Sequence, residues 1–369
     1  MGAKLHRNMP QTRECRRSSK SGRLTAPYPL PLIDIEPLYS RNCGHVVQAA
    51  AALGRAAHEH GFLYIKGHSI DDSAIVDAYT AAQQFFRQPL EFKNQYYIGN
   101  SSNHRGYVPV TEKGVYPDEE DRHYESYDLA LDLPASDPDY VLGNPLLGPN
   151  VWPAIPKFKD AVYNYYLKLG QLGRLLTHAF EIHLGVPAGT FSRKMTKPVA
   201  QLRLLHYIER KNRFDQEGQN MGAHTDYECF TILHQDSPGL QVLDLADHWV
   251  NADPIEGTFL VNIGDMFELW SGGYLKATPH RVVNCGTERF SMPYFAAANY
   301  SAVIKPEPHA HSCPYQKNYH PMVAGHHMME RLIRDFSYIR KRYKPPGLDD
   351  SEDCPSTLSM FEERLHDVV

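Results

Sequence analysis

Short strand-forming segments occupy most of the chain between residues 200 and 300. Some alternate apolar with polar residues and others run apolar throughout, and Gly, Pro and Asp stand between them. These segments are residues 202–207, 231–235, 239–243, 259–263, 266–269, 280–283 and 290–296. Short strands at regular intervals with turn residues between them are typical of a barrel or jelly roll. The sequence therefore predicts an all-β core in this part of the chain.

Helical periodicity lies on both sides of this region. Apolar residues recur at helical spacing in 46–60, 74–86, 157–184 and 325–342, and the first of these helices is followed by a strand at 62–65. The pattern predicts an α+β chain in which helices flank the β core. We divide it into a tail at 1–25, an N-terminal region at 26–150, a long helix at 151–198, the core at 199–302 and a C-terminal helical region at 303–369. All of these parts except the tail are expected to form one structural domain.

Three residues of the β region suit a metal ion. His224 and Asp226 are separated by one residue, and His280 lies 56 residues after His224. Residues i and i+2 of a strand point to the same face, so the first pair can reach one ion together. Two imidazoles and one carboxylate can occupy one face of an Fe(II) ion and leave positions open for substrates. An isolated His-x-Asp also occurs by chance in surface turns, so this motif needs support from elsewhere.

A cation and a hydroxyl follow the third candidate ligand. Arg289 and Ser291 share one face of a predicted strand, and Arg289 lies nine residues after His280. A guanidinium binds a carboxylate through two parallel hydrogen bonds, and the serine adds another donor. We therefore expect this pair to hold one end of a small diacid whose other end chelates the metal.

Several motifs together resemble the isopenicillin N synthase-like superfamily of Fe(II)/2-oxoglutarate-dependent dioxygenases. The resemblance runs from about residue 31 to about residue 338. The segments that carry it, besides the candidate ligands, are Pro31-Leu32-Ile33-Asp34, His60-Gly61-Phe62-Leu63-Tyr64-Ile65, Phe85-Phe86-Arg87-Gln88-Pro89-Leu90-Glu91-Phe92-Lys93, Asn262-Ile263-Gly264-Asp265 and Leu269-Trp270-Ser271. This resemblance implies a double-stranded β-helix, or jelly roll, flanked by N- and C-terminal helices.

The same resemblance implies roles for individual residues. His224, Asp226 and His280 would bind Fe(II), Arg289 and Ser291 would bind 2-oxoglutarate, and O2 would be the second cosubstrate. Tyr207 matches a tyrosine that often contacts 2-oxoglutarate, although Leu205 stands where many plant members have Asn. Family position further suggests a set of residues that flank the substrate pocket, which comprises Arg105, Tyr107, Glu125, Tyr127, Phe295 and Asn299.

The implied reaction is oxidation of a small molecule of specialised or nucleobase metabolism, with release of succinate and CO2. Hydroxylation, desaturation and cyclisation all remain open as outcomes. Three alternatives also remain: an isopenicillin N synthase-like oxidase that uses no 2-oxoglutarate, an ethylene-forming-type enzyme, and a non-enzymatic binding protein.

Composition narrows the partners and the location. The net charge of −5 gives no indication of nucleic acid binding, and no apolar run reaches the length of a membrane span. The six cysteines are scattered, which is typical of a reduced, cytoplasmic protein. The first 25 residues carry seven basic residues and one acidic residue with few apolar ones, so this tail is expected to be disordered. The sequence does not predict an oligomeric state.

Overall fold

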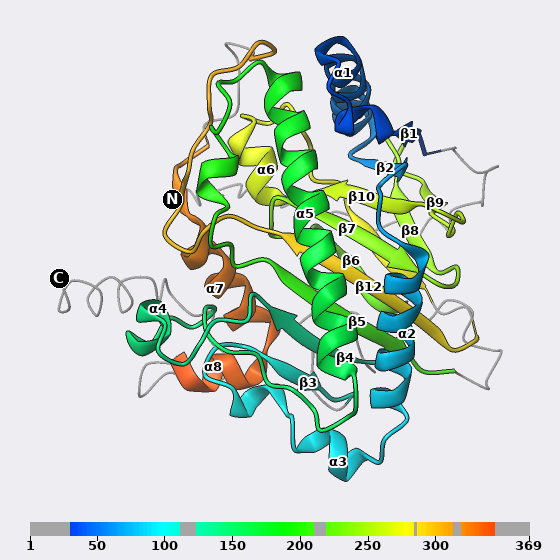
Figure 1. Ribbon diagram of the computed structural model, residues 1–369, viewed down its shortest axis with the longest axis vertical. Helices are drawn as coiled ribbons and strands as arrows, with labels where there is room; N and C mark the ends of the chain where they lie inside the picture. Colours follow the sequence, from blue (N-terminus) through cyan, green and yellow to red (C-terminus); the bar gives the residue numbers. More distant parts are fainter. Residues whose placement is uncertain (1–29, 111–122, 210–218, 284–285, 313–318, 344–369) are drawn as a thin grey trace, which may run out of the picture.

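Two sheets form the centre of the protein, and all of their strand pairs are antiparallel except the parallel pair of β1 and β2 (Figure 1). The computed structural model describes residues 30–110, 123–209, 219–283, 286–312 and 319–343, so the predicted basic tail lies outside the described residues. In spatial order, the eight-stranded sheet contains β1 (Leu32–Asp34), β2 (Phe62–Lys66), β10 (Phe259–Ile263), β7 (Phe230–Gln235), β12 (Arg289–Ala296), β5 (Gln201–Tyr207), β4 (Tyr124–Ala130) and β3 (Gly106–Val108). The four-stranded sheet contains β6 (Gln219–His224), β11 (His280–Val283), β8 (Leu240–Leu243) and β9 (Trp249–Asn251).

Three helices cover one face of the large sheet. They are α1 (Cys43–His60), α2 (Asp72–Phe86) and α5 (Phe158–Leu184), and α5 packs against both of the others (Figure 1). The side chain of Asn42 accepts a hydrogen bond from the backbone N–H of Gly44 at the start of α1. Gly61 ends that helix with a φ of 68°, a left-handed conformation that glycine adopts readily.

The remaining elements are short and lie around the two sheets. They are η1 (Glu36–Tyr39), α3 (Leu90–Asn94), η2 (Ile98–Asn100), α4 (Pro138–Val141), η3 (Ser192–Lys194), α6 (Asp265–Trp270), the strand pair β13 (Val303–Ile304) and β14 (Met322–Val323), α7 (Ala324–Asp335) and α8 (Ser337–Tyr343). The C-terminal helices α7 and α8 lie near one end of the sheets (Figure 1).

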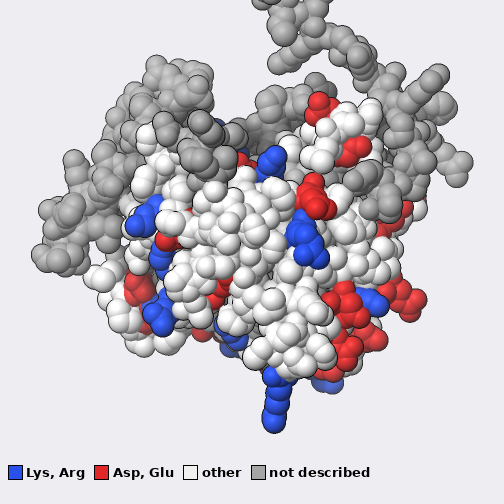
Figure 2. Space-filling view, turned by 90° about the horizontal axis from the view of Figure 1, so that it is seen from above, with Lys and Arg blue, Asp and Glu red and all other residues white. Residues whose placement is uncertain are grey.

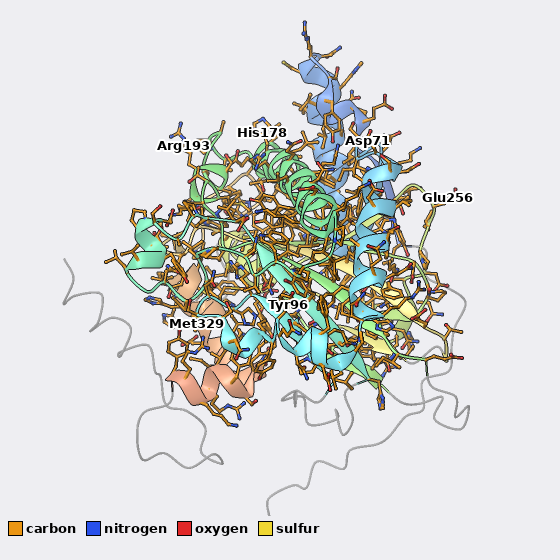
Figure 3. All side chains as sticks on the ribbon, turned by 60° about the horizontal axis from the view of Figure 1, so that its bottom comes forward. Asp71, Tyr96, His178, Arg193, Glu256 and Met329 are labelled. Atoms are coloured by element: carbon orange, nitrogen blue, oxygen red, sulfur yellow. The ribbon has the colours of Figure 1, made fainter. Side chains whose placement is uncertain are left out.

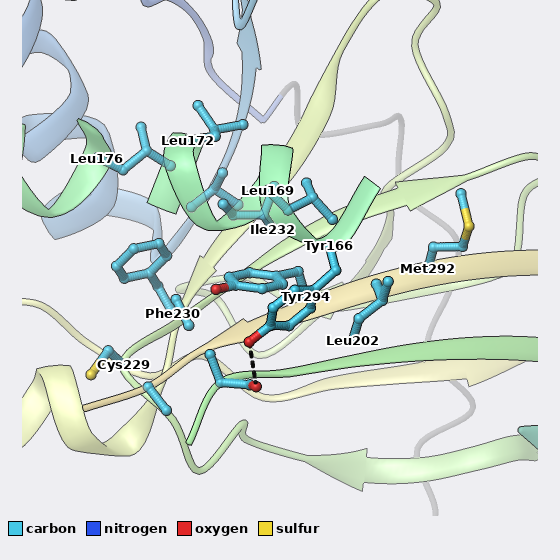
Figure 4. Packing of buried hydrophobic residues seen from close by; sticks show 14 of the residues in the cluster. Tyr166, Leu169, Leu172, Leu176, Leu202, Cys229, Phe230, Ile232, Met292 and Tyr294 are labelled. Carbon is cyan, nitrogen blue, oxygen red and sulfur yellow. Dashed lines mark hydrogen bonds between the residues drawn. The ribbon is translucent and has the colours of Figure 1, made fainter. Parts of the chain in front are cut away.

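The main apolar core fills the space between α5 and the large sheet. Leu169, Leu172 and Leu176 of α5 face Ile232 and Tyr294 of the sheet in the close view of Figure 4. All of these side chains are buried. In the wider view of Figure 3, side chains fill the space between helices and sheets. Because apolar side chains fill the face of the large sheet that packs against α5, a functional site can form only on the opposite face.

The predicted fold class is confirmed, with two errors in its elements. Residues 266–269 were expected to form a strand but belong to the helix α6, where Gly264 is the N-cap and Asp265 and Glu268 are acidic residues of the first turn. An apolar run this short does not distinguish a strand from a buried helix. The predicted closing helix at 325–342 is two helices, α7 and α8, because Phe336 between them is extended and buried.

None of the helices in the described ranges is long and apolar enough to cross a membrane. On the face shown in Figure 2, acidic and basic side chains are interspersed with uncharged ones.

Candidate active site

His224, Asp226 and His280 come together at the open end of the small sheet. His224 is the last residue of β6 and His280 is the first residue of β11, and the two are register partners across the antiparallel pair. Asp226 lies two residues beyond the end of β6, so the expectation that one strand carries both His224 and Asp226 is wrong. The chain turns there because the backbone carbonyl of Asp226 accepts a hydrogen bond from the N–H of Asp265 at 2.8 Å.

The three side chains each direct one ligand atom to a common point. Within the described residues, they form the one group of acidic, histidine or cysteine side chains whose ligand atoms lie within 4.8 Å of one another. Asp226 Oδ1 is 3.8 Å from His224 Nε2 and 3.5 Å from His280 Nε2. On the far side of each ring, Nδ1 lies near a backbone carbonyl, that of Gly222 at 2.8 Å for His224 and that of Thr278 at 3.2 Å for His280.

The second oxygen of Asp226 is occupied by two neighbours. Asn262 Nδ2 donates to Asp226 Oδ2 at 2.6 Å, and the Thr231 hydroxyl donates to the same oxygen. These bonds leave Oδ1 to face the histidines. Such partners fix the orientation of a metal ligand and tune its basicity.

Electrostatics keeps the carboxylate of the cluster ionised. Burial pushes the pKa of Asp226 upward, but the nearby His280 and His224 and its hydrogen bonds hold that pKa well below its usual range. Burial, together with His280, lowers the pKa of His224 to about 4. Burial also pushes the pKa of His280 down, but the carboxylate of Asp226 raises it above its ordinary value. Two nitrogens and one carboxylate oxygen with their lone pairs converging fit Fe(II) bound on one face.

A second polar group lies on the neighbouring sheet. Arg289 and Ser291 lie on β12 with one residue between them and share one face, and Tyr207 of β5 is the register partner of Arg289. The Arg289 guanidinium donates to Gln235 Oε1 at 2.7 Å, to Ser291 Oγ at 3.3 Å and to the carbonyl of Ser237 at 3.1 Å. Its Cζ stacks 4.7 Å from the centre of the Tyr207 ring. The guanidinium is thus fixed in position before any ligand binds.

Comparison with known protein families gives the family of this chain. Residues 199–298 match the 2OG-Fe(II) oxygenase superfamily, and residues 30–155 match the N-terminal family described as non-haem dioxygenase in morphine synthesis. A homoarginine-6-hydroxylase of Oryza sativa subsp. japonica is 32% identical over 329 residues, which cover 83% of this chain and 97% of that protein. The chain belongs to the 2OG-Fe(II) oxygenase superfamily.

A second relative and a solved structure support the same family assignment. A 2-oxoglutarate-Fe(II) type oxidoreductase of Metarhizium rileyi is 34% identical over 78% of this chain and 85% of that protein. The crystal structure of a full-length Neurospora crassa protein in complex with alpha-KG and thymine superposes with a TM-score of 0.72 at 27% identity, over 82% of this chain and 96% of that one. The predicted enzyme class and the dependence on Fe(II) and 2-oxoglutarate are therefore confirmed.

A cavity joins the metal cluster to the arginine. Its empty volume is about 1030 Å³ with its opening to solvent included. The three candidate metal ligands and the predicted cosubstrate residues Tyr207, Arg289 and Ser291 all line it, as does Phe295 from the predicted substrate set. Alternate residues of β5 and β12 provide one wall, because side chains two apart on a strand share a face.

Five other residues predicted to flank the substrate do not line this cavity. Glu125 and Tyr127 lie on β4, where the cavity face carries Tyr124 instead. The Glu125 carboxylate accepts hydrogen bonds from Lys93 Nζ at 2.6 Å and from the Tyr107 hydroxyl, and the Tyr127 hydroxyl donates to the carbonyl of Val151. A shift of one residue along a strand moves a side chain to the opposite face, which explains this error.

Arg105 and Asn299 have structural contacts instead. Arg105 is buried and donates to the carbonyls of Asn103, His104 and Leu146, so it holds together the loop that contains it. Asn299 Oδ1 accepts from the N–H of Lys197 at 2.7 Å, in the turn that follows β12.

Sequence reasoning missed several residues of the cavity. Asn262 is a polar residue within the otherwise apolar strand β10, a signal that could have indicated a residue supporting a metal ligand. Leu332, Asp335 and Phe336, from α7 and its C-terminal end, close the cavity from the far end of the chain. No local sequence pattern indicates that these three residues lie near His224 and Asp226, which are more than a hundred positions earlier.

Glu228 is a further acidic side chain in the cavity wall. Burial, together with the charge of Asp226, raises the pKa of Glu228 to about 8.

Proposed function

We propose that this oxygenase oxidises a small-molecule substrate at a site in which His224, Asp226 and His280 hold Fe(II). In this proposal Arg289, Ser291 and Tyr207 hold the distal carboxylate of 2-oxoglutarate. The metal, when bound with 2-oxoglutarate, supplies O2-dependent oxidation coupled to release of succinate and CO2.

The observation that carries the proposal is the state of Arg289. Its side chain is only 2% exposed, and no carboxylate among the described residues pairs with it. A buried cation without a counter-ion is costly, so the site favours an anion beside the guanidinium. Arg289 lines the same cavity as the metal cluster, which suits a diacid that spans the two.

The residues of the chain have distinct tasks in this reaction. The two histidines and Asp226 occupy one face of the ion and leave its other positions to the cosubstrates. The apolar lining residues Phe62, Leu205 and Leu233 limit the access of water to these positions. The substrate then occupies the remaining part of the cavity beside the metal, between β5, β12 and the end of α7.

Hydroxylation is the outcome that we propose. The names of the homoarginine-6-hydroxylases of rice and soybean support it, as these relatives share 32% and 29% identity with this chain. We propose a nitrogen-containing small molecule as substrate, because one set of relatives is named for homoarginine and the Neurospora crassa protein was crystallised with thymine.

The test is a turnover assay with Fe(II), 2-oxoglutarate and O2 in which succinate is measured as candidate substrates are added. We expect succinate release to rise with an accepted substrate and to match the amount of oxidised product. An oxidase that uses no 2-oxoglutarate would oxidise substrate without succinate, and an ethylene-forming-type enzyme would release ethylene into the headspace. Either of those results would replace our proposal.

A further inference from the structure

Two polar side chains of the cavity wall lack a partner for part of their hydrogen-bonding capacity. Gln201 is 5% exposed, and its Nε2 has no hydrogen-bond acceptor within the described ranges. Glu228 is also 5% exposed, and its carboxyl group accepts a hydrogen bond from the backbone N–H of Tyr227 at 3.1 Å. A buried donor without a partner costs about 1–3 kcal/mol, so Gln201 favours a ligand that pairs with it. The carboxyl group of Glu228 has lone pairs left to accept a further hydrogen bond from the same ligand.

Both side chains lie at the end of the cavity away from Arg289, and for Glu228 this follows because the N–H of the next residue, Cys229, donates to the carbonyl of Ala296 at the end of β12. On the paired strands β5 and β12, Arg289 is opposite Tyr207 and Phe295 is opposite Gln201, so the two pairs mark opposite ends of one wall. About six residues of strand separate them, which is about 20 Å at roughly 3.3 Å per residue. A 2-oxoglutarate held by Arg289 therefore leaves Gln201 to the other substrate.

The position of Glu228 is fixed by its backbone. Its carbonyl accepts from the N–H of Met266 at 3.1 Å, and Gly264 packs directly against it. A Cβ on Gly264 would lie 2.3 Å from that carbonyl oxygen, so only glycine permits this approach. Since Asp226 is two residues earlier, the Glu228 carboxyl is held beside the metal cluster in the cavity wall.

Two polar side chains near Gln201 and Glu228 already have hydrogen-bond partners within the protein. Gln201 and Glu228 therefore remain to bind a ligand. The Arg203 guanidinium makes a double hydrogen bond with Asp128, at 2.8 Å for both contacts. The Tyr227 hydroxyl donates to Asp335. The cavity end therefore offers a donor from Gln201 and an accepting oxygen from Glu228, which a carboxyl group provides in either protonation state.

We propose that Glu228 and Gln201 select substrates that present a nitrogen-bound hydrogen to the carboxyl and a hydrogen-bond acceptor to the amide. This inference rests on the proposed function and specifies the substrate class for the same site. Nitrogenous small molecules meet this requirement, whether neutral like a cyclic imide or cationic like a guanidino acid. A hydrocarbon of the same shape leaves both groups unpaired, and a site of this kind rejects such an analogue.

The test is calorimetric titration of the protein loaded with Mn(II) in place of Fe(II) and with 2-oxoglutarate. The probes are thymine, L-homoarginine, 1,3-dimethylthymine, which lacks N–H groups, and L-norleucine, which lacks the guanidinium. We expect thymine or L-homoarginine to bind at least about tenfold more tightly than its matched analogue, which is the effect of about one good hydrogen bond. This comparison uses the wild-type protein and does not depend on any variant folding.

Variants then assign the effect to residues. Glu228→Leu and Gln201→Leu should each weaken binding of the accepted probe by about tenfold while leaving 2-oxoglutarate affinity unchanged. Gln84→Leu, on the exposed side of α2, is the matched control and should bind as the wild type does. Glu228→Gln keeps an accepting oxygen at the same place, so it should retain binding of the accepted probe.

The proposal is overturned if no N–H probe binds, if the methylated analogue binds equally well, or if Glu228→Leu leaves the affinity unchanged. Binding of Mn(II) and 2-oxoglutarate is measured first in the same titration. A protein that binds both but fails the probe test therefore refutes the substrate class alone, whereas failure to bind them refutes the proposed function.

Discussion

The two faces of strand β5 serve different purposes. Leu202 and Leu204 face the helices and are fully buried in the apolar core. On the other face, Gln201, Arg203 and Tyr207 line the cavity with polar atoms. The same division applies to β12, where Met292 and Tyr294 pack in the core while Arg289 and Ser291 face the cavity.

This contrast shows that, along each strand, residues that stabilise the fold alternate with residues that face the active-site cavity. On the helix-covered face, apolar side chains pack against α5 and need no ligand. On the cavity face, polar groups complete their interactions when ligands bind. Changes on the first face should lower the free energy of unfolding, and changes on the second should lower activity or ligand affinity.

The largest effect is expected for His224→Ala on the cavity face. Removing one of three metal ligands should abolish turnover, because two protein ligands hold the ion too weakly and in the wrong geometry. The free energy of unfolding of the metal-free protein should change little. Both are measured in parallel, by succinate release and by urea titration. Turnover that survived the substitution would refute the assignment of the ligand.

Phe180→Ala tests the helix-covered face. Phe180 lies on α5, is fully buried and contacts Phe230 and Phe267 with ring centres 5.8 and 5.1 Å away. The resulting cavity should lower the free energy of unfolding by about 3–5 kcal/mol. In the fraction that remains folded, the Michaelis constant for 2-oxoglutarate should match the wild type. A changed constant with unchanged stability would contradict the division between the two faces.

Arg289→Ala should raise the concentration of 2-oxoglutarate required for half-maximal turnover. Charge-assisted hydrogen bonds to a carboxylate contribute about 1.5–3 kcal/mol, which corresponds to roughly 10- to 100-fold in that constant. An added anion such as formate does not replace the lost positive charge and should not restore the affinity. An unchanged requirement for 2-oxoglutarate would remove Arg289 from the site.

Asn262→Ala should have a smaller effect on the metal. The amide of Asn262 donates to Asp226 Oδ2 at 2.6 Å, so its loss frees the carboxylate to rotate. Loss of such a partner weakens metal binding by about 10- to 100-fold, and we expect the lower end because Thr231 still donates to the same oxygen. Titration with Mn(II) measures this directly. Equal affinity in variant and wild type would show that Thr231 suffices.

The smallest effect concerns pH and the helix-covered side. The buried Glu181 carboxylate accepts hydrogen bonds from the N–H groups of Gly189, Phe191 and Ser192. Burial pushes the pKa of Glu181 upward, but these donors hold it below its ordinary value. A lowered pKa in the folded state means that this stabilisation is present above the unfolded-state pKa and is lost as pH falls through the folded-state pKa.

Glu181→Gln should therefore be less stable than the wild type at neutral pH, and the difference should shrink in acid below the ordinary pKa of a glutamate. Urea titrations across that pH range measure it, with activity at neutral pH as the control. A difference in stability that persists unchanged into acid would contradict the ionised state of Glu181.

Local patterns in the sequence predicted most of the fold. Alternation located the strands of the core, and helical periodicity located α1, α2 and α5 because each buries an apolar stripe. The pattern failed at 266–269, where the apolar segment is short, and at Phe336, where the helical spacing of apolar residues continues through a break between two helices. No local signal distinguishes a strand from a helix in the first case, or one helix from two in the second.

For the candidate site, the sequence located the residues that converge but not all that surround them. His224, Asp226, His280 and Arg289 belong to motifs with fixed spacing, and the structure brings them to one cavity. Glu125 was assigned to the cavity face because position along the chain does not specify strand register. The contribution of α7 depends on packing between distant segments, and that information is not carried by any motif.

The most direct test of the account is a crystal structure with Fe(II) and 2-oxoglutarate, grown without air. We predict one ion bound by His224 Nε2, Asp226 Oδ1 and His280 Nε2, with 2-oxoglutarate chelating it and its distal carboxylate on the Arg289 guanidinium. An ion at another place, or a 2-oxoglutarate whose distal carboxylate lies away from Arg289, would contradict it.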